Sequence, residues 1–196
     1  MKIAVIGTGK IGGTLGRALA RAGHAVVFGS RHPDDDAVAG DTDAGVTTPA
    51  AALAGADAVL LALPAGAVED FLAGHGRAID GLLVIDATNR MGGPVLNASA
   101  QIAEAAPAAR YVRAFNSLGW ENFADPVFDG VPADLFFSAP ETDRKAVEEI
   151  ISAVGLRPAY LGESQQDVVD SVLRLWFALI RARGGNRQQA FRVLER

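Results

Sequence analysis

The chain of 196 residues is 49% hydrophobic and 21% charged, proportions that are ordinary for a globular protein of one domain. Its net charge of −5, without a dense block of Lys and Arg, argues against a nucleic-acid-binding surface. The absence of cysteine excludes disulfides, thiolate metal sites and a cysteine nucleophile. No apolar run approaches the roughly 20 residues of a membrane span, and the first residues predict a strand rather than a signal peptide, so we expect a cytoplasmic protein.

Short apolar runs and helical patterns alternate along most of the chain. The runs predict strands at residues 2–7, 25–30, 58–64, 82–89, 111–116 and 135–139, with a weaker strand at 45–47. Most are apolar throughout, as strands covered on both faces are. Thr48 followed by Pro49 predicts a helix N-cap, and a helix after Thr142 is expected to end at Gly155. This alternation predicts an α/β fold of Rossmann type, with a doubly wound, mainly parallel sheet.

The last part of the chain changes character and predicts a short helical extension. Residues 163–183 have a helical pattern, with Ser164 as the expected N-cap and Asp167 three residues later. A short amphipathic helix is expected after Gly184 and Gly185. We therefore divide the chain into a dinucleotide-binding domain, residues 1–162, and an extension, residues 163–196. The apolar face of the long helix is wider than one contact requires, which implies a second covering surface. A homodimer is the commonest way to provide one, and burial within a large core is the alternative.

The segment GTGKIG at residues 7–12 has the G-x-G-x-x-G pattern, directly after a predicted strand and at the start of a helix. In that context Gly7 allows the tight turn, Gly9 lets the backbone approach a pyrophosphate, and Gly12 lets helix and strand pack closely. The N–H groups and partial positive charge of the helix N-terminus would face the phosphates. The alternative is a glycine-rich turn that serves only packing.

The end of the second predicted strand favours NADP(H) over NAD. An NAD site usually carries Asp or Glu there, about 20 residues beyond the motif, bound to the ribose hydroxyls. This chain has Ser30, Arg31 and His32 instead. A hydroxyl and a guanidinium suit a 2′-phosphate, because both donate hydrogen bonds to an anion. The acidic run at residues 34–36 follows at once, and we expect it to lie in a solvated loop, since carboxylates pointing inward would repel the phosphate.

The carboxyl ends of the strands at 58–64, 82–89 and 111–116 carry no His, Lys, Glu or Cys. Asp86 is the nearest acid, and His75 is expected in a surface turn. An enzyme that acts on an alcohol or a ketone normally needs a proton donor at the reacting oxygen. The missing donor favours an acceptor that takes hydride at carbon, such as a flavin-like ring, with proximity and orientation supplying most of the rate.

Several segments together resemble the NADP-dependent oxidoreductases that use the deazaflavin coenzyme F420: GTGKIGGTLGRALARAGHAVVFGSR, LALP, VIDATN, AFNSLGWENFADP and the closing GNRQQAFRVL. The resemblance implies a Rossmann domain that binds NADP(H), a C-terminal part that helps to form the second-cofactor pocket, and direct hydride transfer between the rings without a catalytic side chain. It implies Thr8, Gly9, Lys10 and Ile11 at the pyrophosphate, Ser30 and Arg31 at the 2′-phosphate, and Leu63, Pro64, Ala87 and Asn116 along the nicotinamide half. With Gly7, Gly12, His32 and Asn89, these residues form the predicted cofactor-binding set.

Three aromatic residues, Phe115, Trp120 and Phe123, are candidates for stacking on a second cofactor, F420 or a flavin, although each is equally compatible with a loop core. Two other functions remain open. One is an NADPH-dependent imine or ketone reductase related to the β-hydroxyacid dehydrogenases, with Asp170 as the acid, although Asp167 and Asp170 are expected to be solvated. The other is a non-catalytic NADP(H)-binding sensor. In each case the partner is a small molecule, and no metal site is predicted.

Overall fold

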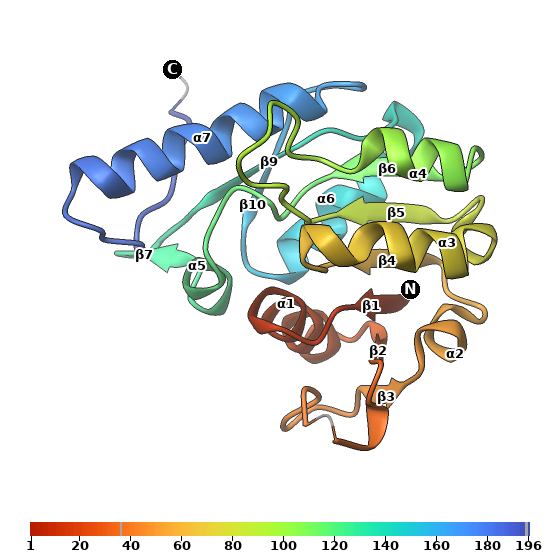
Figure 1. The fold of residues 1–196 in the computed structure, drawn as a ribbon. Coiled ribbons are helices and arrows are strands. Elements are labelled where there is room, and N and C mark those ends of the chain that lie inside the picture. The colour runs from red at the N-terminus through yellow and green to blue at the C-terminus, as the bar shows by residue number, and fades with distance from the viewer. Residues whose placement is uncertain (36, 195) are drawn as a thin grey trace.

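The computed structural model describes residues 1–35, 37–194 and 196. Within these residues the main sheet has six parallel strands in the order β3-β2-β1-β4-β5-β6 (Figure 1). The strands are β1 (Lys2–Ile6), β2 (Ala25–Gly29), β3 (Gly45–Thr47), β4 (Ala58–Leu61), β5 (Leu83–Asp86) and β6 (Arg110–Arg113). The strand order reverses between β1 and β4, which is where doubly wound sheets bind ligands. The predicted Rossmann-type α/β fold is confirmed.

Helices cover both faces of this sheet, and the alternating side chains of β1 show how. Ile3 and Val5 pack into the core beneath α1 (Lys10–Arg21) and α6 (Arg144–Ala153). Ala4 and Ile6 pack into the opposite core beneath α2 (Pro49–Leu53), α3 (Val68–Ile79) and α4 (Ser99–Ala105). Successive side chains of a strand point to opposite faces, so a strand that is apolar throughout supplies both cores. The predicted Thr48 cap is confirmed, because its Oγ1 accepts a hydrogen bond of 3.4 Å from the N–H of Ala51.

A smaller two-stranded sheet extends the fold beyond β6. The run at residues 135–139 gives β9 (Asp134–Phe137), which pairs in parallel with β10 (Arg157–Tyr160) across α6. A single antiparallel bridge between Arg113 and Ser138 joins this pair to the main sheet. β10 was not predicted, since it is short, contains Pro158 and is only half-buried. A tight hairpin of β7 (Val127–Phe128) and β8 (Val131–Pro132) follows the short helix α5 (Trp120–Ala124).

The long C-terminal helix, α7 (Gln166–Ala182), lies beside β9 and β6 (Figure 1). Its predicted start was wrong, because Ser164 has a φ of +59° and α7 begins after Gln165 without a side-chain cap. The backbone N–H of Gln165 instead donates a hydrogen bond of 2.9 Å to Oγ of Ser138. The start of α7 is therefore fixed by a contact with the end of β9 rather than by the local sequence.

The predicted terminal helix was also wrong, since residues 186–194 are not helical. Their carbonyl groups bind other elements. The indole N–H of Trp176 donates to the carbonyl of Gln189 at 2.8 Å, and the N–H of Asp134 donates to that of Phe191 at 2.9 Å. A backbone that bonds to α7 and β9 cannot also form its own helical turns. Among the described residues, no helix is both long and apolar enough to cross a membrane.

Candidate functional site

A cavity of about 810 Å³ opens at the carboxyl ends of β1, β2, β4 and β5. It brings together most of the predicted cofactor-binding set, namely Gly7, Thr8, Gly9, Lys10, Ile11, Ser30, Arg31, His32, Leu63, Pro64, Ala87 and Asn89. Gly12 and Asn116 do not line it. Because these residues come from segments far apart in the chain, the sheet has placed them along one continuous surface.

The three glycines of the motif differ in what requires them. Gly7 has a φ of +111°, and a Cβ there would lie 2.5 Å from the carbonyl oxygen of Ala62. A Cβ on Gly12 would lie 1.9 Å from the carbonyl oxygen of Gly7, so these two positions need glycine for the path and packing of the backbone. Gly9 has an ordinary φ of −69°, and, apart from its own stretch of chain, no described atom lies within 4 Å of a Cβ built there. Neither packing nor conformation requires glycine at position 9.

The N-terminus of α1 faces this cavity with its own backbone groups. Gly9 is the N-cap residue, and within the described chain no side chain caps the helix and no acidic residue lies in its first turn. Lys10 and Ile11, the first residues of α1, line the cavity. The first N–H groups of a helix lack partners in the helix, and its dipole places partial positive charge there. This end of the cavity therefore suits an anion.

At the end of β2, the hydroxyl of Ser30 is buried and accepts a hydrogen bond of 3.1 Å from the N–H of His32. Arg31 and His32 are exposed at the rim, and Arg31 forms no ion pair with any other described residue. Asp34 is exposed and does not line the cavity. The side chain of Asp35 and the whole of Asp36 lie outside the described residues. A free guanidinium beside a hydroxyl is a suitable arrangement for binding a phosphate.

The wall formed by α3 was not predicted. His75, expected in a surface turn, lies within α3, lines the cavity and contacts the ring of Phe71, with the ring centroids 5.1 Å apart. Asp70 lines the same wall. The spacing of Phe71 and His75, one helical turn apart, is the sequence signal that could have placed both rings on one face of a helix.

At the other end, over β4 and β5, the cavity is lined by Leu63, Pro64, Ala87 and Asn89. The side chain of Asn89 is held on both sides. Its Oδ1 accepts a hydrogen bond of 2.8 Å from Nη2 of Arg113, and its Nδ2 donates one of 2.9 Å to the backbone carbonyl of Asn116. The side chain of Asn116 is buried and donates to Oδ1 of Asp170 at 3.2 Å instead of reaching the cavity.

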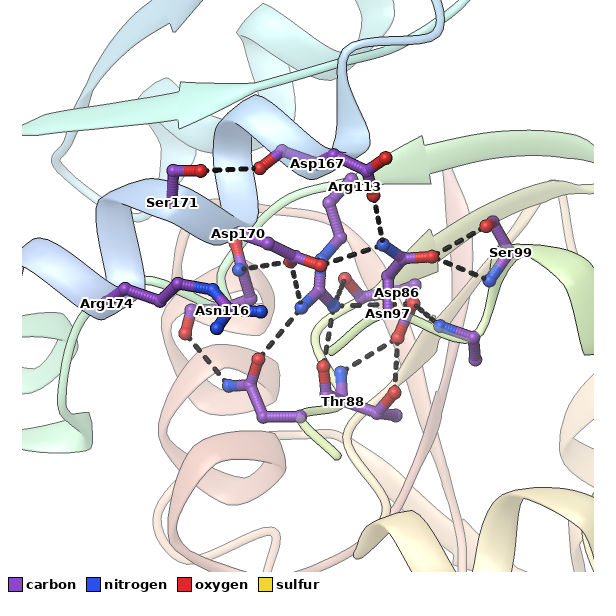
Figure 2. Close-up of polar contacts among 12 residues, drawn as sticks. Asp86, Thr88, Asn97, Ser99, Arg113, Asn116, Asp167, Asp170, Ser171 and Arg174 are labelled. Atoms are coloured by element: carbon purple, nitrogen blue, oxygen red, sulfur yellow. Dashed lines mark hydrogen bonds and ion pairs between the residues drawn. The ribbon is translucent and has the colours of Figure 1, made fainter. Parts of the chain in front are cut away.

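Behind this wall lies a buried polar cluster, which we call the Arg113 cluster. Figure 2 shows Asp86, Thr88, Asn97, Arg113, Asn116 and Asp170. Asn89 completes the cluster through its bonds to Arg113 and Asn116. Arg113 is completely buried and forms ion pairs with Asp170 at 2.7 Å and with Asp86 at 3.3 Å. Sequence reasoning missed Arg113, because an arginine inside a strand gives no signal of the distant carboxylates that it meets. Asp170 was expected to be solvated, which is wrong, since only 3% of its surface is exposed.

This geometry gives Asp170 a structural role rather than an acidic one. Its Oδ1 faces the guanidinium of Arg113, its Oδ2 accepts a hydrogen bond of 2.7 Å from Nδ2 of Asn97, and it does not line the cavity. Both carboxylate oxygens are engaged by protein groups, so Asp170 has no free path to a ligand in the cavity. The reductase alternative, which needs Asp170 as the acid, therefore finds no support here.

Asp86 organises the loop that follows β5. Its carboxylate accepts hydrogen bonds from the N–H and Oγ1 of Thr88, the N–H of Ala98 and the hydroxyl of Tyr111. Burial and the adjacent Asp86 carboxylate raise the pKa of the Tyr111 hydroxyl well above its usual value, so it stays protonated and donates. These bonds fix the backbone that carries Ala87 and Asn89 into the cavity wall.

Of the three candidate aromatic residues, only Trp120 remains accessible. Phe115 and Phe123 are buried against each other with ring centroids 5.8 Å apart, so they belong to the loop core and cannot stack on a ligand. Trp120 is half-buried at the start of α5, and Nζ of Lys10 lies 4.9 Å from the centroid of its ring. Lys10 therefore lies between the glycine-rich loop and an accessible indole.

The fold is of Rossmann type, and the cavity lies at the edge of the sheet where such folds bind dinucleotides. A family model described as "NADP oxidoreductase coenzyme F420-dependent" matches residues 2–90, which confirms the resemblance over this part of the chain and supports an NADP-dependent oxidoreductase. The matched part contains the glycine-rich loop, the end of β2 and Asn89. No curated protein matches the chain.

Solved structures share the fold over larger parts of the chain. A protein from Arthrobacter sp. FB24, provisionally named an F420-dependent NADP reductase, is 24% identical with a TM-score of 0.85, and all of both chains is covered. A hypothetical protein from Sinorhizobium meliloti is 29% identical with a TM-score of 0.70, over 83% of this chain and 85% of that one. A reductive aminase from Aspergillus terreus, solved with NADPH4, is 22% identical with a TM-score of 0.73; the match covers 94% of this chain but only 62% of the aminase.

Proposed function

We propose that this cavity binds NADP(H) and that the protein transfers a hydride between the nicotinamide and a deazaflavin, F420, or a flavin-like ring. The pyrophosphate would lie against the loop at residues 7–12 and the N-terminus of α1. The 2′-phosphate would contact Ser30 and Arg31, with His32 beside them. Since the loop follows β1 and the 2′-phosphate site follows β2, the nicotinamide half would extend the other way, over β4 and β5.

The observation that carries this proposal is the open space over Gly9. Packing does not require glycine there, because its backbone conformation is ordinary and a Cβ would meet no described atom within 4 Å beyond its own stretch of chain. What distinguishes Gly9 from other open glycines is its place on the cavity, where the missing side chain lets a ligand approach the backbone. A pyrophosphate bound at the N-terminus of α1 would need the space left by the absent side chain of Gly9. It would also accept hydrogen bonds from the first N–H groups of the helix, which no side chain caps.

The choice of acceptor depends on the nicotinamide end of the cavity. Leu63, Pro64, Ala87 and Asn89, which follow β4 and β5, line it, and none of them can donate or take up a proton near neutral pH. Asp70 and His75, the titratable groups of the cavity wall on α3, are the alternative donors that the turnover test would reveal. An acceptor that takes hydride at a ring carbon needs only close approach, while solvent supplies the proton that balances the reduced ring. Trp120 offers a half-buried aromatic surface for such a ring.

We also propose that the chain acts as a cytoplasmic homodimer and that residues 163–196 complete the second-substrate pocket. The outer face of α7 exposes 48% of Val168 and 51% of Leu175. Apolar side chains along one face of a long helix favour a covering surface, and a second copy is the commonest source of one. Sedimentation of the full chain would test the dimer.

Substitution at Gly9 tests the nucleotide site. We expect Gly9→Ala to weaken NADPH binding at least about 10-fold and Gly9→Val to weaken it further, because the new atoms occupy ligand space. The free energy of unfolding should fall by no more than about 1 kcal/mol, the cost of losing glycine at the N-cap. Gly74→Ala is the matched control, since Gly74 in α3 is equally open, has an ordinary φ and lies outside the cavity. NADPH affinity that survives Gly9→Val would contradict the proposed site.

Turnover tests the acceptor. The purified protein would be mixed with NADPH and, in separate arms, with F420, a flavin, or a panel of cyclic imines and ketones, and the loss of deazaflavin or NADPH absorbance followed. We expect reduction of a ring acceptor. Reduction of imines or ketones alone would replace this proposal by the reductase alternative. NADPH binding without turnover in any arm would favour a sensor.

A further inference from the structure

The guanidinium of Arg113 donates four hydrogen bonds inside the protein. Nε donates to Oδ1 of Asp170 at 2.8 Å, Nη1 donates to the carbonyls of Asp86 and Thr88 at 3.0 and 2.6 Å, and Nη2 donates to Oδ1 of Asn89 at 2.8 Å. Nη2 also lies 2.7 Å from Oδ1 of Asp170, as part of their ion pair. Because the side chain is completely buried, Arg113 cannot contact a ligand itself.

These bonds determine which way the amide of Asn89 points. Arg113 can only donate, so the atom of Asn89 that it meets must be the oxygen, and the amide nitrogen must lie on the other side. One N–H of that nitrogen goes to the carbonyl of Asn116 at 2.9 Å. Within the described residues the other N–H has no protein partner, and Asn89 lines the cavity. Asn89 can therefore offer a hydrogen-bond donor to a ligand.

Asp170 holds Arg113 in the position that orients Asn89. It comes from α7, 57 residues along the chain from Arg113, and it is the only carboxylate in Figure 2 that reaches both Nε and Nη2. Asn97 and Asn116 donate to Asp170 at 2.7 and 3.2 Å, so its own rotamer is fixed. Phe115, directly before Asn116, has a φ of +58°, a strained conformation for an aromatic residue that such surroundings must maintain.

We propose that Asp170 is a positioning residue which acts through Arg113, so that Asn89 presents an amide N–H to the nicotinamide half of the bound dinucleotide. The acceptor would be a hydroxyl of the nicotinamide ribose or the carboxamide oxygen. This inference rests on the proposed function, because it requires NADP(H) in the cavity. It links the C-terminal helix to the cavity wall without any contact between that helix and the ligand.

The test compares NADPH with adenosine 2′,5′-bisphosphate, which carries the adenosine half and the 2′-phosphate but lacks the nicotinamide half. We expect Asn89→Ala to raise the Kd for NADPH about 5- to 10-fold, as the loss of one hydrogen bond does, and to leave the Kd for the bisphosphate within about 2-fold. A general loosening of the site would weaken both ligands. Asn89→Ala removes no buried charge, so the variant should fold. Its binding data therefore show, without any other variant, whether Asn89 donates a hydrogen bond to the ligand.

Asp170→Asn tests the positioning role. We expect it to raise the Kd for NADPH but not for the bisphosphate, and to add nothing further when combined with Asn89→Ala, because both changes remove the same contact. Asp167→Asn is the matched control on the same helix, since Asp167 is exposed and contacts only Asn97 among the cluster side chains, at 3.3 Å. We expect it to bind both ligands normally.

The outcomes separate the two proposals. A wild-type protein that does not bind NADPH would overturn both. Normal wild-type binding with an unchanged NADPH Kd in Asn89→Ala, or equal losses for both ligands, would overturn this inference and leave the proposed function standing. Additive losses in the double variant would also overturn it, because Asp170 would then act by another route. If Asp170→Asn does not fold, the Asn89→Ala comparison still decides whether the donor exists.

Discussion

The glycine-rich loop and the Arg113 cluster both lie at the carboxyl edge of the main sheet, yet they are built in opposite ways. The loop consists of consecutive residues, presents backbone N–H groups and leaves open space at Gly9. The cluster joins side chains from β5, β6 and α7, and its guanidinium is fully enclosed. Groups left without partners can bind a ligand, whereas groups that satisfy one another can only fix a structure.

The two regions should therefore respond differently to mutation: the loop through ligand affinity and the cluster through the stability of the fold. A change in the loop should reduce affinity while leaving the fold intact. A change in the cluster should reduce the free energy of unfolding, because a buried charge that loses its partner keeps the full cost of its desolvation. Asn89 is where the two regions meet, since it belongs to the cluster and also lines the cavity.

The largest effect is expected from Arg113→Met. It leaves Asp86 and Asp170 buried without their counter-charge, so the free energy of unfolding should fall by about 3–5 kcal/mol, as measured by urea denaturation. Arg144→Met is the control, because its contacts with Glu141, Glu148 and the ring of Tyr160 are half-exposed and should each contribute less than about 1 kcal/mol. Equal losses in the two variants would break the comparison, since the cluster would then be no more important than a surface pair.

A smaller effect, on binding alone, is expected from Arg31→Ala. It should weaken NADPH binding about 10- to 100-fold, the equivalent of one charge-assisted contact, while NADH binding and the unfolding midpoint stay unchanged. Calorimetric titration with NADPH and with NADH would measure the ratio of the two dissociation constants in the wild type and in the variant. Arg77→Ala, an exposed change on α3 outside the cavity, serves as the control. Parallel losses for NADPH and NADH would remove the 2′-phosphate role of Arg31.

The smallest effect is expected at Asp134, whose carboxylate is buried but whose partners are half-exposed. Burial alone would raise its pKa, but hydrogen bonds from Arg157 and the N–H of Val193, with the charges of Arg157 and Arg192, hold the pKa below its usual value. Its stabilising contribution is therefore present above the unfolded-state pKa of about 4 and is lost as the pH falls through the lower folded-state pKa.

Asp134→Asn should accordingly make the free energy of unfolding less dependent on pH below about pH 4. At pH 7 that free energy should fall by about 1 kcal/mol. Unfolding midpoints between pH 3 and pH 7 would measure this. Glu148→Gln, at the exposed pair with Arg144, is the control. If the unfolding midpoint of Asp134→Asn falls with acid as much as that of the wild type, the pair of Asp134 with Arg157 does not stabilise the fold. A buried carboxylate would then contribute no more than an exposed one.

The sequence by itself determined the glycine-rich loop, the parallel sheet, the Thr48 cap and the cavity residues that follow β1, β2, β4 and β5. Each depends on neighbours within a few residues, or on the rule that parallel strands end at the same edge, so local patterns were sufficient. Only the tertiary structure decided the roles of Arg113 and Asp170, the position of His75 in the wall, the start of α7 and the path of the last residues. These depend on charges and carbonyl groups that meet across dozens of residues, and no local pattern records such a meeting.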